Sequence, residues 1–185
     1  MKFSQVILGI YVLLTLNLEG QTILFEESFL EELAQMELTF IPPLEGDFKI
    51  RPNENLRILE IDQTLWSKSE KLEVRIALVS VAELGELAEL PDMAARLLVM
   101  DIASNDEYAS PIAIHRFGDE EMAHFQADWA RQYTFQPKPG QIPFQTVQLT
   151  ALFRRGRGMA YLIMAFNRAP ETLDARQKML RFKEN

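Results

Sequence analysis

The sequence predicts an α+β domain in which an antiparallel β-sheet is flanked by helices. Two observations lead to this prediction. Residues 56–80 and 144–166 each carry two strand-like segments around a polar turn, and residues 91–104 and 119–133 repeat apolar residues at helical spacing. Hairpins with helices inserted between them are typical of the α+β class, because each helix covers an apolar face of the sheet.

The first twenty residues have the pattern of a secretory signal peptide. Met1 and Lys2 precede an apolar run over residues 6–16, and Gly20 offers a small residue for cleavage. A bilayer-spanning helix needs roughly 20 apolar residues, so the run suits a cleaved signal better than a permanent span. We expect a secreted or periplasmic protein without stable membrane insertion after cleavage, and an uncleaved anchor is the alternative. Residues 21–185 then form a single α+β domain.

Composition excludes several classes of protein. The chain has 185 residues, 48% of them hydrophobic and 25% charged, which is ordinary for a globular domain. It lacks cysteine, which excludes disulfides, thiolate zinc sites and cysteine nucleophiles. Its formal net charge of -8 repels polyanions, so we expect no nucleic-acid partner.

The N-terminal part of the domain begins with a short acidic helix over residues 25–35 and a strand over residues 36–41, which Pro42 and Pro43 end. The first hairpin turns at residues 67–70. In its first strand we expect Leu59, Ile61 and Leu65 on one face. In its second strand, four apolar residues alternate with Glu73 and Arg75 and are Leu72, Val74, Ile76 and Leu78. The alternation predicts that Glu73 and Arg75 lie on an outer, solvent-facing side of the sheet.

Two longer helices are predicted in the middle of the chain. The first covers residues 91–104, since Pro91 suits a first helical position and Met93, Leu97 and Met100 follow at helical spacing. The second runs over residues 119–133 and is expected to cover the sheet. Its apolar stripe consists of Met122, Phe125, Trp129 and Tyr133.

A second hairpin joins residues 144–153 to residues 159–166 through a turn that contains Gly156 and Gly158, which tolerate positive φ angles. The segment 159–166 is apolar on both faces and is therefore expected to be a central strand. A terminal helix over residues 170–183 is predicted to dock Met179 and Phe182 on the sheet.

Three short stretches in this order resemble PsbP-like domains. They are Leu72-Glu73-Val74-Arg75 in the first hairpin, Ala127-Asp128-Trp129 in the second helix, and Met159-Ala160-Tyr161-Leu162 before the terminal helix. The resemblance runs over most of residues 25–184. It implies a three-layer α/β/α sandwich around a curved antiparallel sheet, and a role in binding or assembly. Because the superfamily shares no catalytic motif, no functional residue is carried over.

The two histidines are the candidates for hidden chemistry. Glu120, His124 and Asp128 stand at i, i+4 and i+8 of the predicted second helix, a spacing that could present ligands to a divalent metal. Helical geometry places His124 opposite the apolar stripe, in solvent and without a pocket, which favours an ordinary exposed face. His115 precedes this helix. The sequence contains no serine-hydrolase elbow and no phosphate-binding glycine loop.

The turn of the second hairpin holds the only local concentration of positive charge, formed by Arg154, Arg155 and Arg157. It could hold a phosphate or an acidic partner, although a solvated turn is the simpler reading. The sequence therefore favours an exported, non-enzymatic binding or accessory protein with an unknown protein or envelope component as partner and no cofactor. The alternative is a metal-dependent or other hydrolase that uses His115 and His124 with nearby carboxylates.

Overall fold

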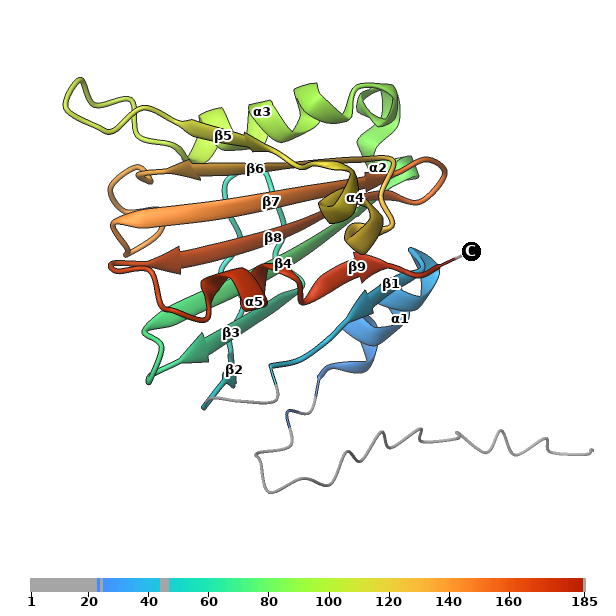
Figure 1. The fold of residues 1–185 in the computed structure, drawn as a ribbon, viewed down its shortest axis with the longest axis horizontal. Coiled ribbons are helices and arrows are strands. Elements are labelled where there is room, and N and C mark those ends of the chain that lie inside the picture. Colours follow the sequence, from blue (N-terminus) through green and yellow to red (C-terminus); the bar gives the residue numbers. More distant parts are fainter. Residues whose placement is uncertain (1–22, 24, 44–46, 185) are drawn as a thin grey trace, which may run out of the picture.

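The computed structural model describes residue 23, residues 25–43 and residues 47–184 (Figure 1). The expected signal peptide lies outside the described residues. The helices are α1 (Glu27–Gln35), α2 (Val81–Leu84), the 3₁₀-helix η1 (Gly85–Glu89), α3 (Pro91–Ile102), α4 (Asp119–Phe125) and α5 (Leu173–Gln177). The strands are β1 (Leu38–Phe40), β2 (Lys49–Arg51), β3 (Gln63–Ser67), β4 (Leu72–Ser80), β5 (Ala113–Arg116), β6 (Trp129–Phe135), β7 (Thr146–Arg154), β8 (Gly158–Phe166) and β9 (Leu180–Phe182).

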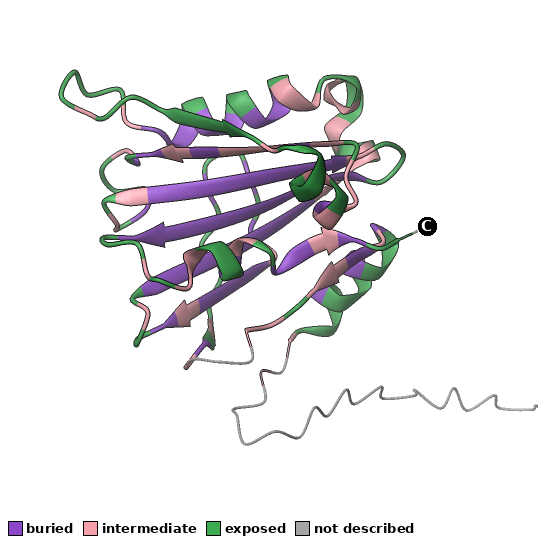
Figure 2. Cartoon of the chain, viewed as in Figure 1, coloured by how far each residue is buried: buried purple, intermediate pink, exposed green. Residues whose placement is uncertain are grey.

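A seven-stranded antiparallel sheet in the order β2-β3-β4-β8-β7-β6-β5 organises the chain, and β1 and β9 form a separate antiparallel pair. The α+β prediction is thereby confirmed. Both predicted hairpins form, as β3–β4 and β7–β8. Every residue of β8 is buried, as expected for a central strand, and Figure 2 shows it purple along its length.

The sheet carries an apolar cluster on each face. The cluster on one face, the α3 side, includes Ala95, Leu98 and Ile102 of α3. The cluster on the other, the α1 side, includes Phe29 of α1 and Phe125 of α4, together with residues of β1 and β9. Figure 1 shows α4, α5 and β9 in front of the large sheet. The finer expectation of a three-layer sandwich stays a prediction.

The outer position expected for Glu73 and Arg75 is wrong. Both side chains are buried, and Arg75 Nη2 lies 2.7 Å from Glu73 Oε1. The segment that precedes β3 covers this face of β4, since Arg75 Nη1 donates a hydrogen bond of 3.2 Å to the carbonyl oxygen of Glu54.

The expectation that Leu59, Ile61 and Leu65 share one face of a strand is also wrong, because the regular pairing of β3 begins only at Gln63. Leu59 and Ile61 therefore join the α3-side cluster, whereas Leu65 joins the other.

The predicted helix over residues 119–133 ends at Phe125, where Gln126 adopts a left-handed conformation with φ 51°. Trp129 and Tyr133 belong to β6 instead. Residues four apart lie on the same side of a helix and also on the same face of a strand. The apolar spacing therefore could not distinguish a helix from a strand at Trp129 and Tyr133.

The predicted terminal helix is likewise shorter than expected. Helix α5 has five residues, and the chain then enters β9, whose Phe182 pairs with Leu38 of β1. Met179 and Phe182 are buried as predicted, although Phe182 is held by a strand. The partner strand lies about 140 residues away in the sequence, so no local pattern could indicate it.

Candidate functional site

The three arginines of the β7–β8 turn lie together at an open pocket of about 680 Å³. The turn is tight because Gly156 and Gly158 have φ angles of 75° and 127°, as the sequence predicted. Besides the arginines and Gly156, the pocket is lined by the end of α4 and two carboxylates from elsewhere, through Met122, Ala123, Gln126, Ala127, Asp128 and Glu37. The hairpin tip is thus part of a concave surface.

Two of the three arginine side chains already have partners within the protein. Arg157 Nη2 lies 2.5 Å from Glu37 Oε1, and Arg154 Nη1 donates to the carbonyl oxygen of Lys183 at 2.6 Å. The backbone N–H of Arg155 donates to Asp128 Oδ2 at 2.7 Å, which fixes the turn. The exposed guanidinium of Arg155 has no hydrogen bond or ion pair with any residue that the structure describes. It is the group of the turn best placed to meet an external carboxylate or phosphate.

Both histidines line a second, smaller pocket of about 330 Å³ between β5, α4 and α5. His115 Nε2 lies 3.4 Å from Glu121 Oε1, and His124 Nε2 lies 3.5 Å from the carbonyl oxygen of Lys178. The expectation that His124 has no pocket is therefore wrong, because residues of and after α5, among them Gln177 and Lys178, line a pocket together with His124. The pKa of Glu121 is lowered, chiefly because the backbone N–H of Gly118 donates to its carboxylate.

The metal-ligand spacing suggested by the sequence is not assembled. Asp128 lies beyond the end of α4 and lines the arginine pocket, so Glu120, His124 and Asp128 do not share a helix face. Within the described part of the chain, no group of three or more His, Asp or Glu side chains is arranged to hold a metal ion. The histidine pocket instead brings His115, His124, Glu121 and Asp174 to one surface.

A third feature, an exposed apolar surface, was missed by the sequence reasoning. Ten large hydrophobic side chains are exposed among the described residues, and seven of them lie between Leu90 and Ile114. Four follow one another along α3 at intervals of three and four residues and are named here the α3 stripe: Leu90, Met93, Leu97 and Met100. The other three are Tyr108, Ile112 and Ile114, in and before the edge strand β5.

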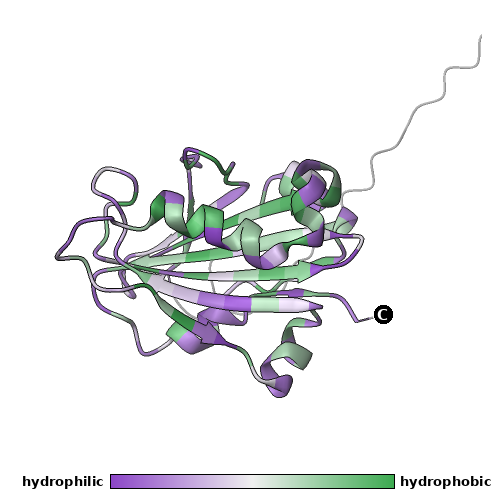
Figure 3. Ribbon diagram, turned by 90° about the horizontal axis from the view of Figure 1, so that it is seen from above, coloured by the Kyte–Doolittle hydropathy of each residue, from purple (hydrophilic) through white to green (hydrophobic). Residues whose placement is uncertain are grey.

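The α3 stripe faces solvent because a different set of residues docks the helix. The side chains that α3 buries are Ala94, Ala95, Leu98, Val99, Asp101 and Ile102. At 100° per residue the centre of this set lies roughly 140° around the helix from the centre of the stripe, and Asp101 borders the stripe. Figure 3, which looks from above, shows hydrophobic green along α3. The sequence did contain a signal for this surface, because α3 carries apolar residues on both of its sides. The sequence does not indicate which of the two sides packs against the sheet.

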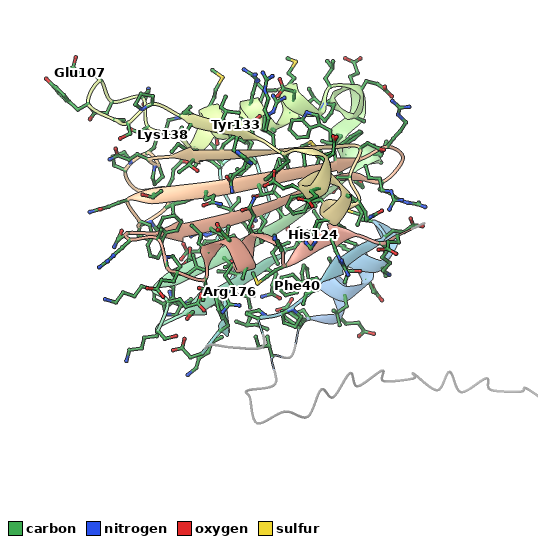
Figure 4. All side chains as sticks on the ribbon, viewed as in Figure 1. Phe40, Glu107, His124, Tyr133, Lys138 and Arg176 are labelled. Atoms are coloured by element: carbon green, nitrogen blue, oxygen red, sulfur yellow. The ribbon has the colours of Figure 1, made fainter. Side chains whose placement is uncertain are left out.

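The cations along α3 are engaged by two aspartates and two carbonyl oxygens of the helix, whereas the acids at its two ends form no ion pair among the described residues. Arg96 and Arg131 both bind Asp92, and Arg57 binds Asp101. Lys138 Nζ donates to the carbonyl oxygens of Met100 and Asp101 at the end of the helix. The exposed acids at the two ends are Glu86 and Glu89 before α3 and Asp106 and Glu107 after it. Among the described residues none of these four forms an ion pair. Figure 4 shows Glu107 at the far end of the loop.

Comparisons with family models, curated proteins and solved structures found no match for this chain. The resemblance to PsbP-like domains therefore stays a prediction. No helix among the described residues is long and apolar enough to cross a membrane.

Proposed function

We propose that this chain is an exported, non-enzymatic binding or accessory protein that holds a partner protein through the α3 stripe. One observation carries the proposal: among the ten exposed large hydrophobic side chains in the described structure, four form the α3 stripe and three more lie in and just before β5. Contiguous exposed apolar surface on a folded domain marks an interaction site more often than chance placement does.

The packing of α3 supports this reading. The helix is already anchored to the sheet by its own buried face, so the stripe contributes little to folding. Fully burying one large apolar side chain is worth roughly 1.5 to 3 kcal/mol, and Met100 remains 69% exposed. The other three side chains are 42% to 52% exposed, so a partner that covers the stripe would gain about half of that energy at these positions.

The PsbP-like layout and the signal-like N-terminus form the second part of the proposal. A seven-stranded antiparallel sheet with an apolar cluster on each face is compatible with the three-layer sandwich of PsbP-like domains. The proposed resemblance to these domains implies a role in binding or assembly.

The mature N-terminus is proposed to be Gln21. N-terminal sequencing of protein recovered outside the cytoplasm tests the export step, and an intact Met1 in the cytosol would contradict it.

Site-specific photo-crosslinking tests the binding surface. A photo-reactive phenylalanine derivative at position 100 is expected to give a discrete crosslinked product in the producing cells, and Leu97→Ser is expected to remove that product. The same derivative at position 30 is the matched control, because Leu30 is a similarly exposed apolar residue on α1. Equal crosslinking from positions 100 and 30 would argue that the stripe binds nothing specific.

The alternative function is a hydrolase that uses His115 and His124, and one observation favours it: both histidines line the same pocket with Glu121 and Asp174. If the pocket holds a metal, His115→Ala and His124→Ala should each lower the metal content of the purified protein. Unchanged metal content together with unchanged hydrolysis of ester and phosphoester test substrates would remove this alternative.

A further inference from the structure

We propose that the partner segment that binds the α3 stripe is a cationic amphipathic helix, with an apolar face bordered at both ends by Lys or Arg. This inference rests on the proposed function and specifies the chemistry of the segment that the α3 stripe would bind. Two features of the surface carry it: the helical spacing of the stripe and the acids at both ends of α3.

The stripe has the length and shape that a helix requires. From Leu90, the N-cap of α3, to Met100 it covers eleven residues, and the ten steps between them are about 15 Å of helix at 1.5 Å per residue. Its side chains follow at intervals of three, four and three residues, so they form one ridge along the solvent side of α3. A second helix laid along this ridge contacts all four side chains, the usual geometry of helix packing. A strand added at the edge of β5 would instead lie at the level of the sheet.

The exposed charges near α3 determine which charge the ends of the partner segment should carry. Glu86 and Glu89 are exposed in η1 just before α3, and Asp106 and Glu107 are exposed in the loop that extends beyond its C-terminal end (Figure 4). Arg57 and Arg96, beside the stripe, are already paired with aspartates of α3. The acids at both ends therefore attract a segment whose own ends are basic, and the net charge of -8 acts in the same direction.

The same charges argue against a second copy of this chain. If two α3 helices packed antiparallel, Glu86 and Glu89 of each copy would approach Asp106 and Glu107 of the other. If they packed parallel, like acids would meet at each end. Acid faces acid in either direction, and such juxtaposition is unfavourable at an interface. An anionic membrane surface would be repelled for the same reason.

Fluorescence anisotropy with three labelled 18-residue peptides and the full domain tests the proposal. The first peptide has a leucine face at helical spacing with two lysines at each end. The second has glutamates at the ends, and the third has the composition of the first in an order that breaks the apolar face. We expect the lysine-ended helix to bind at least about tenfold more tightly than either control. It has four surface charge pairs that the glutamate-ended peptide lacks, together worth about that factor, and an apolar face that the third peptide lacks.

Protein variants assign the effect to the two features. Met93→Ser with Leu97→Ser is expected to weaken binding of the lysine-ended peptide at least tenfold, whereas Leu30→Ser leaves it within about twofold. Neutralising the four acids as E86Q, E89Q, D106N and E107Q should remove the preference for lysine over glutamate ends and most of the salt dependence. The matched control neutralises four exposed acids elsewhere, Glu26, Glu27, Glu31 and Glu171, and should change neither the preference for lysine ends nor the salt dependence.

Each outcome separates this inference from the proposed function. Stripe-dependent binding with equal affinity for lysine-ended and glutamate-ended helices would overturn the cationic partner and leave the docking surface standing. A dimer in sedimentation that Met93→Ser abolishes would overturn the inference in favour of a second copy. Failure of all three peptides would overturn the inference, and together with equal crosslinking from positions 100 and 30 it would overturn the proposed function as well.

Discussion

Gly158 occupies a position where a side chain has no room. It opens β8 opposite Ser80 with a φ of 127°, and a Cβ at this position would lie 2.1 Å from the carbonyl oxygen of Val79. We expect Gly158→Ala to lower the free energy of unfolding by at least about 2 kcal/mol, because the β4 backbone has to shift. Urea unfolding measures the loss.

The matched control for this substitution is Gly156→Ala in the same turn. Gly156 also has a positive φ, of 75°, but its Cβ would enter open space. Its loss should stay near 1 kcal/mol, the usual cost of a left-handed backbone for alanine. Equal losses at the two positions would show that contact with β4 does not decide the effect.

Asp62 is a second residue with a measurable signature. Burial raises its pKa from 3.8 to about 7, and the charge of Glu32 acts in the same direction, although the backbone N–H of Leu78 donates to its carboxylate. The folded state thus favours the protonated form. Between pH 4 and pH 7 the unfolded chain ionises first, so the free energy of unfolding should fall as the pH rises through this window.

Asp62→Asn keeps an oxygen that accepts from Leu78 and removes the titration. We expect the variant to lose most of this pH dependence and to be more stable than the parent at pH 8 by roughly 1 to 2 kcal/mol, after allowance for partial exposure. Denaturant titrations between pH 4 and pH 8 test this, with Glu60→Gln as an exposed control. A parallel pH profile in parent and Asp62→Asn would refute the assignment.

The candidate site residues were only partly accessible to sequence reasoning. The arginines of the β7–β8 turn could be selected because they are adjacent in the chain. The ion pair between Arg157 and Glu37 could not be predicted, because the two residues are 120 positions apart in the sequence. His115 and His124 were recognised as candidates, but their shared pocket depends on where α5 packs.

At the scale of single elements, β4 departs most from its local pattern. Its alternation of apolar and charged residues predicted one solvated face, yet the side chains of Glu73 and Arg75 are only 7% and 3% exposed. We expect Glu73→Ala to cost about 3 to 5 kcal/mol in the free energy of unfolding, because it leaves a buried guanidinium without its closest carboxylate.

The double variant Glu73→Leu with Arg75→Met separates the lost pair from lost packing. It removes both charges and keeps similar volume, so its stability should return to within about 1 to 2 kcal/mol of the parent. Thermal unfolding of parent, single and double variants makes the comparison. A double variant as unstable as Glu73→Ala would mean that the ion pair itself, rather than an unpaired charge, decides the stability of β4.

The elements that the sequence mis-assigned failed for two different reasons. In β6 the apolar positions 129 and 133 stand four residues apart, which suits a helix and a strand equally. In β9 the strand has three residues and exists only because β1 lies beside it. The two hairpins were predictable because strand, turn and strand are contiguous in the chain.

At the scale of the whole molecule, the two apolar clusters share the strands of one sheet. We therefore expect the described domain to unfold as one cooperative unit. Leu33→Ala in the α1-side cluster and Leu98→Ala in the α3-side cluster should each lower the free energy of unfolding by about 2 to 4 kcal/mol.

Two probes followed in one urea titration check this expectation. Tryptophan fluorescence reports on Trp66 and Trp129 in β3 and β6, and far-ultraviolet circular dichroism reports on the whole backbone. The two curves should coincide for the parent and for both variants. Separate transitions in either variant would show that the clusters unfold independently.

The sequence by itself determined the α+β class, the two hairpins, the central position of β8 and the acidic character of the surface. These properties follow from residue periodicity and composition within short windows, where backbone geometry alone sets the pattern. Only the tertiary structure decided that Glu73 and Arg75 are buried, that β9 pairs with β1, and that the α3 stripe stays in solvent. Such outcomes depend on which surfaces meet across the fold, because a helix that is apolar on two sides can bury either one until the sheet selects it.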